Sequence, residues 1–315
     1  MIGDKDGCEA FLSIERFAMN SSVIVMIMVA IQIIAESFPI SSSGHMLLIE
    51  KLVTVLGLGF VPALPEFFDH FLHGPTIVVL ILYFWRAWLE PLRFLLTGGF
   101  NYVTTKNMRD SWRHVYMIFF KIVGLISIAD GITVIFYYVI KKRVYSIVTL
   151  DSTGMLLAGF MITMGLLLSL RLLKNDASSK TLSNFHAVIL GIVQGLTLLT
   201  GISRFASTYV IARWLGISHR RAFQFSFLML FPLIIAGFFV NGLPEIFTSQ
   251  ISREIFNQSI LSIIIWMLII IGSGIVSFYA LKLADYMGAC EKLWWFGVYM
   301  LAPVTVTLML LFAGR

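Results

Sequence analysis

Two short polar segments hold the residues of this sequence that could do chemistry. The first begins with Gln32 and Glu36, which are four residues apart and therefore lie on one face of a helix. After Pro39, which breaks the helix, comes a turn of small and hydroxyl side chains that ends in a histidine: Ser41, Ser42, Ser43, Gly44 and His45. A new half-helix that starts around His45 would point its free backbone N–H groups at this turn, an arrangement that suits a phosphate.

The second segment, TGISRFAST, repeats this arrangement later in the chain and adds a guanidinium, Arg204. Its other candidate phosphate ligands are Gly201, Ser203, Ser207 and Thr208. We therefore expect two helix N-termini and one arginine to face each other.

The elements that carry these segments are membrane helices. Of the 315 residues, 58% are hydrophobic and only 13% are charged, far from the charge content of a soluble domain. Lys and Arg fall in short connections between apolar runs, which indicates membrane topology and argues against nucleic acid as a partner. We predict an all-α polytopic membrane protein with about six transmembrane helices, at about 70–90, 114–140, 154–173, 222–243, 260–282 and 294–313.

Two further apolar stretches, about 21–54 and 185–217, are interrupted by the polar segments. Neither half of either stretch is long enough to span, so each is predicted to be a re-entrant helix hairpin. The two stretches also match each other, since Gln32 and Gln194 stand at the same distance before a serine. We expect a retained N-terminal segment, 1–20, and one membrane domain, 21–313, made of two repeats, about 21–150 and 151–313. The distribution of Lys and Arg favours an inverted repeat with both termini outside and the hairpin tips meeting near the midplane.

Each polar residue also has a plainer interpretation. Hydroxyls and glycines are common where membrane helices pack, and a histidine such as His45 can simply be a packing residue. Glu36 and Arg204 are harder to explain in this way, because a charge at the membrane centre costs roughly 2.5–3.5 kcal/mol on insertion scales.

Four other polar residues are weaker candidates. Asp69, His70 and His73 have a spacing that could bind a metal, but we expect them at the mouth of a span, in contact with headgroups. Asp130 has no evident partner, although it is expected to face the bundle interior.

The two segments together resemble the signatures of a known family, the bacterial undecaprenyl-diphosphate phosphatases associated with bacitracin resistance. The first signature, Glu or Gln, three residues, Glu, then Pro-x-Ser-Ser-x-Gly-His, is matched completely from Gln32 to His45. The second, Pro-Gly-x-Ser-Arg-Ser-x-x-Thr, is matched except that Thr200 replaces the proline and Phe205 the second serine. The resemblance extends over most of the chain from about residue 21.

The resemblance implies an enzyme of the bacterial inner membrane that hydrolyses undecaprenyl diphosphate to the monophosphate lipid carrier, with Mg²⁺ or Ca²⁺ supporting activity. It implies Ser42 as nucleophile, Glu36 with Gln32 as base or metal ligands, and His45 as acid/base partner. Arg204 would hold the phosphate together with Ser41, Ser43, Gly201, Ser203, Ser207 and Thr208. The expected partners are the polyprenyl diphosphate and membrane lipids, and a homodimer is left open.

Two other functions fit the same features. A flippase could carry the lipid phosphate across the bilayer without cleaving it, and the two departures in the second signature could mark such a change. A catalytically inert paralogue would explain those departures but not the complete first signature.

Overall fold

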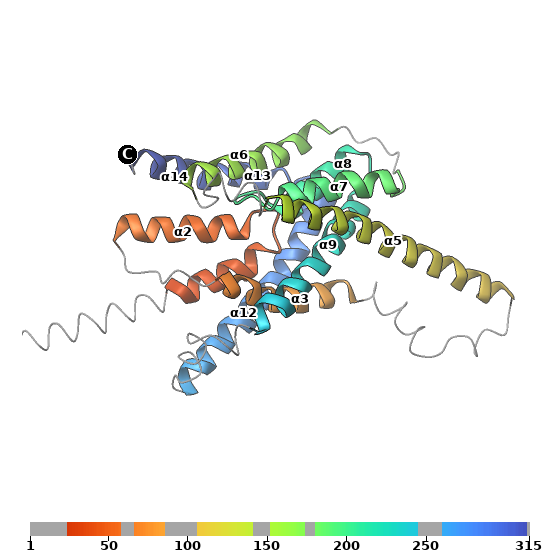
Figure 1. Cartoon of the computed structure of the whole chain (residues 1–315), viewed down its shortest axis with the longest axis horizontal. Helices are drawn as coiled ribbons and strands as arrows, with labels where there is room; N and C mark the ends of the chain where they lie inside the picture. Colours follow the sequence, from red (N-terminus) through yellow and green to blue (C-terminus); the bar gives the residue numbers. More distant parts are fainter. Residues whose placement is uncertain are drawn as a thin grey trace, which may run out of the picture.

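The computed structural model describes residues 24–57, 66–85, 106–140, 152–173, 180–244 and 260–313, and for 66–69, 106–116 and 262 it describes the backbone only. The predicted N-terminal segment 1–20 lies outside these residues. The described residues are arranged as helices, with no strand among them (Figure 1). In chain order the helices are Ile24–Ala35, α2 (Ser42–Leu56), α3 (Glu66–Tyr83), α5 (Lys106–Val139), α6 (Thr153–Ser169), η2 (Leu170–Leu172), α7 (Asn184–Leu196), α8 (Arg204–Trp214), α9 (His219–Ala236), η3 (Gly237–Gly242), α12 (Ile260–Ala289), α13 (Trp295–Tyr299) and α14 (Leu301–Ala313).

Five stretches within the described residues are long and apolar enough to cross a membrane, and the chain is an all-α polytopic membrane protein. They are Met117–Val139, Thr153–Leu172, His219–Gly242, Ile263–Ala289 and Trp295–Ala313. Five of the six expected spans are thus found. The sixth differs from the prediction of about 70–90, because α3 begins earlier, at Glu66, and the apolar part described, His70–Tyr83, is shorter than a span.

Each polar segment lies between two short helices. In Figure 1 the helix Ile24–Ala35 and α2 extend from the centre of the molecule to one side, whereas α7 and α8 extend to the opposite side. The helix Asn184–Leu196 has 13 residues, or roughly 20 Å at ~1.5 Å per residue, which is too short to cross the hydrocarbon core. The polar segments therefore meet in the interior, between the ends of four half-helices.

The half-helices that follow the breaks begin at serine caps. Ser41 has an extended backbone, and its hydroxyl accepts a hydrogen bond from the Gly44 N–H at 3.2 Å, so α2 begins at Ser42, three residues before the predicted start around His45. Ser203 caps α8 in the same way, accepting from the Ala206 N–H at 3.2 Å. Both caps fix the helix N-termini at the tips.

Glycines allow the two tips to touch. A Cβ on Gly44 would lie 2.9 Å from the Cα of Gly201, and a Cβ on Gly201 would lie 2.8 Å from the carbonyl oxygen of Leu156 in α6. Thr163 of α6 binds the same tip, because its hydroxyl donates to the Gly201 carbonyl and accepts from the Ser203 N–H, both at 3.0 Å. The close packing of backbone against backbone leaves no room for a side chain at this crossing.

We expect Gly201→Ala to destabilise the protein strongly. Gly201 has a φ of +89°, which costs an L-residue about 1–2 kcal/mol, and the added methyl would also press on rigid backbone, which typically costs about 1–3 kcal/mol more. Gly216→Ala is the matched control, since its φ is +87° but its nearest neighbour is the flexible Lys180 side chain at 3.3 Å. Thermal unfolding in detergent should show the larger loss for Gly201→Ala, and equal losses would contradict the crowding argument.

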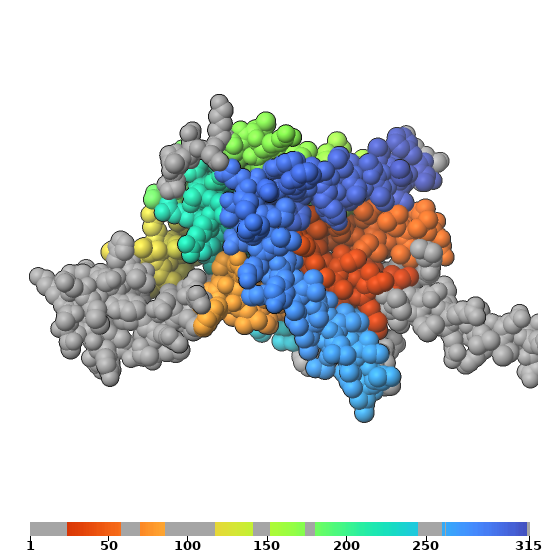
Figure 2. Space-filling model, turned by 180° about the vertical axis from the view of Figure 1, so that it is seen from behind, coloured from red at the N-terminus to blue at the C-terminus, as the bar shows by residue number. Residues whose placement is uncertain are grey.

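The long helices each pack on a half-helix far away in sequence. On α5, Thr133 donates to the Gly191 carbonyl of α7 at 3.2 Å, and Asp130 accepts a hydrogen bond from the Gln194 side chain at 3.2 Å. On α12, Ser277 donates to the Ile33 carbonyl at 3.0 Å. Figure 2 shows α12 crossing one face of the molecule beside the first hairpin. The partner of Asp130 is thus Gln194, which the sequence did not reveal. The division of the chain into two repeats stays a prediction.

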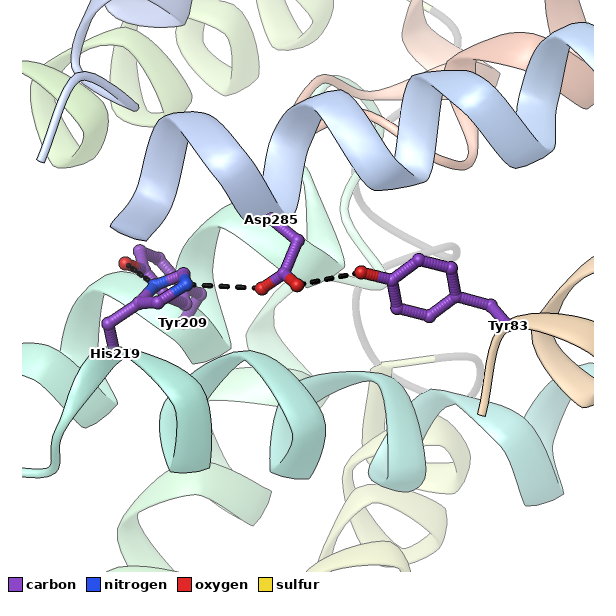
Figure 3. A network of polar contacts seen from close by, with 4 residues as sticks. All are labelled: Tyr83, Tyr209, His219 and Asp285. Carbon is purple, nitrogen blue, oxygen red and sulfur yellow. Dashed lines mark hydrogen bonds and ion pairs between the residues drawn. The ribbon is translucent and has the colours of Figure 1, made fainter. Parts of the chain in front are cut away.

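A polar network joins the four helices α3, α8, α9 and α12 (Figure 3). Asp285 of α12 accepts a hydrogen bond from the Tyr83 hydroxyl of α3 at 2.7 Å and lies 3.1 Å from Nε2 of His219, at the start of α9. The other ring nitrogen, His219 Nδ1, is 2.8 Å from the Tyr209 hydroxyl of α8. The network therefore ties together the helices that also carry parts of the candidate site, α3, α8 and α9.

Candidate active site

A cavity of about 60 Å³ lies where the two tips meet. Its walls come from both polar segments, together with α3 and α9. Seven of the predicted site residues line it: Gln32, Glu36, Ser41, Ser42, Ser43, Ser203 and Arg204. Two residues predicted to lie on one helical face, Gln32 and Glu36, are in contact, since the Gln32 side chain donates to Glu36 Oε1 at 3.4 Å.

Glu36 has a buried carboxylate in which one oxygen contacts a neighbouring side chain and the other has no partner among the described residues. Its Oε1 lies 2.6 Å from Nδ1 of His73, and the two side chains are only 7% and 9% exposed. Its Oε2 is also buried but has no hydrogen-bond partner among the described residues. A buried polar atom without a partner is rare and costly in a folded protein, so Oε2 is an oxygen that a ligand in the cavity could engage.

His73 is the main residue of the site that the sequence did not identify. We expected it at the mouth of a span in contact with headgroups, and that expectation was wrong, because α3 begins at Glu66 and His73 lies two turns inside it. The signal was present only as a polar residue in the middle of an apolar helix. His70 is adjacent, with the two ring centroids 6.0 Å apart, while the side chain of Asp69 lies outside the described residues.

We expect His73→Leu to lower both stability and activity. The change removes the imidazole that contacts the buried Glu36 carboxyl group, and leaving a buried polar group without its partner costs about 1–3 kcal/mol. His73→Gln, which keeps an uncharged N–H donor, should retain most of the stability. Thermal unfolding and phosphate release, measured on both variants in detergent, test this role. Wild-type values in His73→Leu would contradict it.

The tips present two helix N-termini to the cavity. Ser42 and Ser43 are the first residues of α2, and Arg204 and Phe205 are the first residues of α8. The N–H groups of a first turn have no partner within their own helix, and the helix dipole adds partial positive charge. With the Arg204 side chain, the tips give the cavity an electropositive wall, and the carboxylate of Glu36 lines the same cavity.

Arg204 is half-buried, and its guanidinium makes no hydrogen bond or ion pair within the described part of the chain. Arg204 and Glu36 therefore do not form an ion pair with each other, and the Glu36 carboxylate contacts His73 instead. The guanidinium keeps its donors for an anion in the cavity.

Phe205 explains one departure from the second signature. Its ring is buried, lines the cavity, and packs on Phe227 with the centroids 4.3 Å apart and on Phe223 at 5.3 Å. Where the family signature has a hydroxyl, this chain has an aromatic wall that joins α8 to α9.

Four predicted site residues do not line the cavity. His45 faces away from it, with Nδ1 2.6 Å from the Ser41 carbonyl and Nε2 3.1 Å from the Tyr299 hydroxyl. Thr208 donates its hydroxyl to the Arg204 carbonyl at 2.9 Å within its own helix. Gly201 serves the crossing of the tips, and Ser207 is buried. Their roles in catalysis or phosphate binding stay predictions, and the geometry favours supporting the tips.

The residues present fit a divalent cation as part of its ligand set. Glu36 Oε2 is an oxygen donor without a protein partner, and the Gln32 side chain is beside it. Within the described residues there is no group of three or more His, Cys, Asp or Glu that could hold a metal. Mg²⁺ commonly takes one or two carboxylates and completes its shell with substrate phosphates and water, so the fit depends on a phosphate-bearing ligand.

Comparison with known proteins decides the family. Residues 25–306 match the family described as bacitracin resistance protein BacA. The chain belongs to this family. The matched range includes both tips and every residue that lines the cavity, so the BacA resemblance seen in the two signatures is confirmed.

Curated BacA-type relatives support the assignment over most of the chain. An undecaprenyl-diphosphatase of Borrelia hermsii is 29% identical over 294 residues, which cover 93% of this chain and 100% of the relative. One from Treponema denticola is 27% identical, covering 92% and 97%. One from Gluconobacter oxydans is 33% identical over 219 residues, covering 67% of this chain and 72% of the relative.

Proposed function

We propose that this chain hydrolyses undecaprenyl diphosphate to undecaprenyl phosphate and inorganic phosphate in the bacterial inner membrane, and so recycles the lipid carrier of cell-wall synthesis. The observation that carries the proposal is the shared cavity, in which a serine and two helix N-termini lie with a carboxylate and an arginine. The relatives named undecaprenyl-diphosphatase supply the substrate. A flippase, which would need no nucleophile at this position, is not favoured.

Ser42 is the proposed nucleophile. Its hydroxyl oxygen attacks the terminal phosphorus, the bond from that phosphorus to the bridging oxygen breaks, and undecaprenyl phosphate leaves. Water then cleaves the phosphoserine, which releases phosphate and restores the hydroxyl. A serine hydroxyl needs a base for the first step, and the carboxylate of Glu36, which lines the same cavity, is suited to accept the proton.

Arg204 and the two helix N-termini hold the phosphoryl group that is transferred. Phosphoryl transfer depends mainly on positioning and on neutralising the charge of the equatorial oxygens. The guanidinium can bind two of these oxygens at once, while the N–H groups of Ser42, Ser43 and Phe205 are at the same end of the cavity.

Glu36 and Gln32 would hold a divalent cation, Mg²⁺ or Ca²⁺, which when bound neutralises the charge of the diphosphate. Removal with EDTA tests this part of the proposal. Loss of phosphate release that returns with Mg²⁺ or Ca²⁺ would support a cation in the reaction. If release is insensitive to EDTA, the carboxylate serves as the base alone.

The experiment that tests the function is phosphate release from undecaprenyl diphosphate, or from the shorter farnesyl diphosphate, by the purified protein in detergent. We expect continuous release over many turnovers. The same protein in liposomes should be assayed for movement of polyprenyl phosphate between leaflets. Transport without phosphate release would support the flippase, and neither activity would support an inert paralogue.

A further inference from the structure

A second cavity, of about 280 Å³, lies between α5, the residues just before α7, and the start of α9. It shares no residue with the active-site cavity. On α9 the active-site cavity is lined by Leu230 and Ile234, whereas the second cavity is lined by Phe225 and Leu228. The two cavities are therefore separate binding spaces.

The lining of the second cavity changes from charged at one end to apolar at the other. Its α9 wall is Arg221, Gln224, Phe225 and Leu228, which follow one another at the spacing of a single helical face, from charged to apolar. Because Arg221 is in the first turn of α9, the charged end of the cavity is at the helix start and the apolar end lies deeper in the span.

The α5 wall adds a second cation. Lys121 lines the cavity together with apolar neighbours one turn away on the same face, among them Leu125. Lys121 is exposed and has no hydrogen bond or ion pair within the described residues, while Arg221 donates one long bond, 3.4 Å, to the Lys180 carbonyl. None of the described residues that line the cavity is acidic, so two positive charges at its mouth have no neutralising partner within that part of the chain.

An exposed apolar surface of α5 adjoins the cavity. Next to Lys121, α5 exposes Phe120 and Val123, by 63% and 41%, on a helix apolar enough to span the membrane. The distribution of Lys and Arg predicts that the connections before α5 and α9, 86–113 and 213–221, are cytoplasmic. The mouth would then lie at the level of the inner-leaflet headgroups.

We propose that this cavity binds an anionic phospholipid of the bilayer, with its phosphate on Lys121 and Arg221 and the upper part of an acyl chain along Phe225 and Leu228. Basic pockets between membrane helices on the cytoplasmic side are suited to such headgroups. A zwitterionic lipid fits less well, because its ammonium group would be brought to a cavity mouth that already holds two cations. This site is independent of the proposed function.

Native mass spectrometry of the delipidated protein with added phosphatidylglycerol or phosphatidylcholine tests the proposal. We expect phosphatidylglycerol to bind more tightly than phosphatidylcholine. The double variant Lys121→Ala/Arg221→Ala should weaken the binding of phosphatidylglycerol by about thirtyfold, because each cation near a charged surface contributes about 1 kcal/mol. The matched control is Lys282→Ala/Lys292→Ala, which removes two exposed cations that do not line the cavity and should leave binding unchanged. Lys121→Gln/Arg221→Gln replaces the alanine pair if that pair lowers Tm.

Three results would overturn the proposal. Equal loss in both double variants would mean that binding follows net charge alone. Equal binding of phosphatidylcholine would mean that the cavity recognises only hydrocarbon. Displacement of phosphatidylglycerol by stoichiometric undecaprenyl phosphate would mean that the occupant is a polyprenyl lipid. Inorganic phosphate, in contrast, is not expected to displace phosphatidylglycerol.

Discussion

Ser42→Ala is expected to abolish nearly all phosphate release while the protein stays folded. Ser42 is the first residue of α2 and lines the same cavity as Glu36, so the change removes the attacking oxygen without removing a cap or a core contact. Losing the nucleophile of a covalent mechanism typically costs several orders of magnitude in kcat. The assay is phosphate release under single- and multiple-turnover conditions, with thermal unfolding in detergent as the test of folding.

Two neighbouring serines are the controls. Ser43→Ala removes a hydroxyl from the next residue of the same cavity wall and should be much milder. Ser41→Ala should cost about 1 kcal/mol of stability, because Ser41 caps α2, with a smaller loss of activity. Activity in Ser42→Ala equal to wild type would exclude serine catalysis at this site, and equal losses in all three variants would point to a packing role for the tip.

Arg204→Lys is expected to lower kcat/KM by about ten- to a thousandfold with nearly unchanged Tm. Lysine keeps the charge but loses the planar fork, and hydrogen bonds to charged groups are worth roughly 1.5–3 kcal/mol each. Stability should be unaffected because the guanidinium has no partner among the described residues. Kinetics on undecaprenyl diphosphate or farnesyl diphosphate, alongside thermal unfolding, measure both quantities.

The alternative is that Arg204 neutralises Glu36 and holds the two tips together. In that case Arg204→Ala should unfold the protein, and Arg204→Leu combined with Glu36→Leu should restore stability, since an apolar pair can replace a buried ion pair at little cost. Full activity in Arg204→Lys, with stability that depends on Glu36, would remove the phosphate-binding role. The contact of Glu36 with His73 favours the first outcome.

Local features of the sequence were sufficient for much of the architecture. Membrane helices can be predicted from runs of apolar residues, because such a run is visible in the sequence whichever helices it packs against. The first helix break follows from Pro39, and the serine caps follow from Ser41 and Ser203, because each of these residues acts on its own backbone or on that of the neighbouring turn. The site residues nearest to the breaks, Ser42 and Arg204 among them, were predicted for this reason.

Boundaries and rotations of helices were less predictable. The start of α3 at Glu66 lies before the apolar run, so hydropathy placed His73 at the wrong depth. His45 follows the tip by only a few residues, yet its ring points to Tyr299, far along the chain, and not into the cavity. A side chain's direction depends on which helix packs beside it, and the sequence does not record that choice.

The sequence by itself determined that the chain is an all-α membrane protein, that two polar tips interrupt it, and that those tips hold a serine, a carboxylate and an arginine. Only the tertiary structure decided their partners: His73 for Glu36, Gln194 for Asp130, and the backbone of Leu156 against Gly201. The physical reason is range. Hydropathy, breaks and caps act within a few residues, whereas each of these contacts joins separate helices and exists only once their crossing angles and rotations are set by packing.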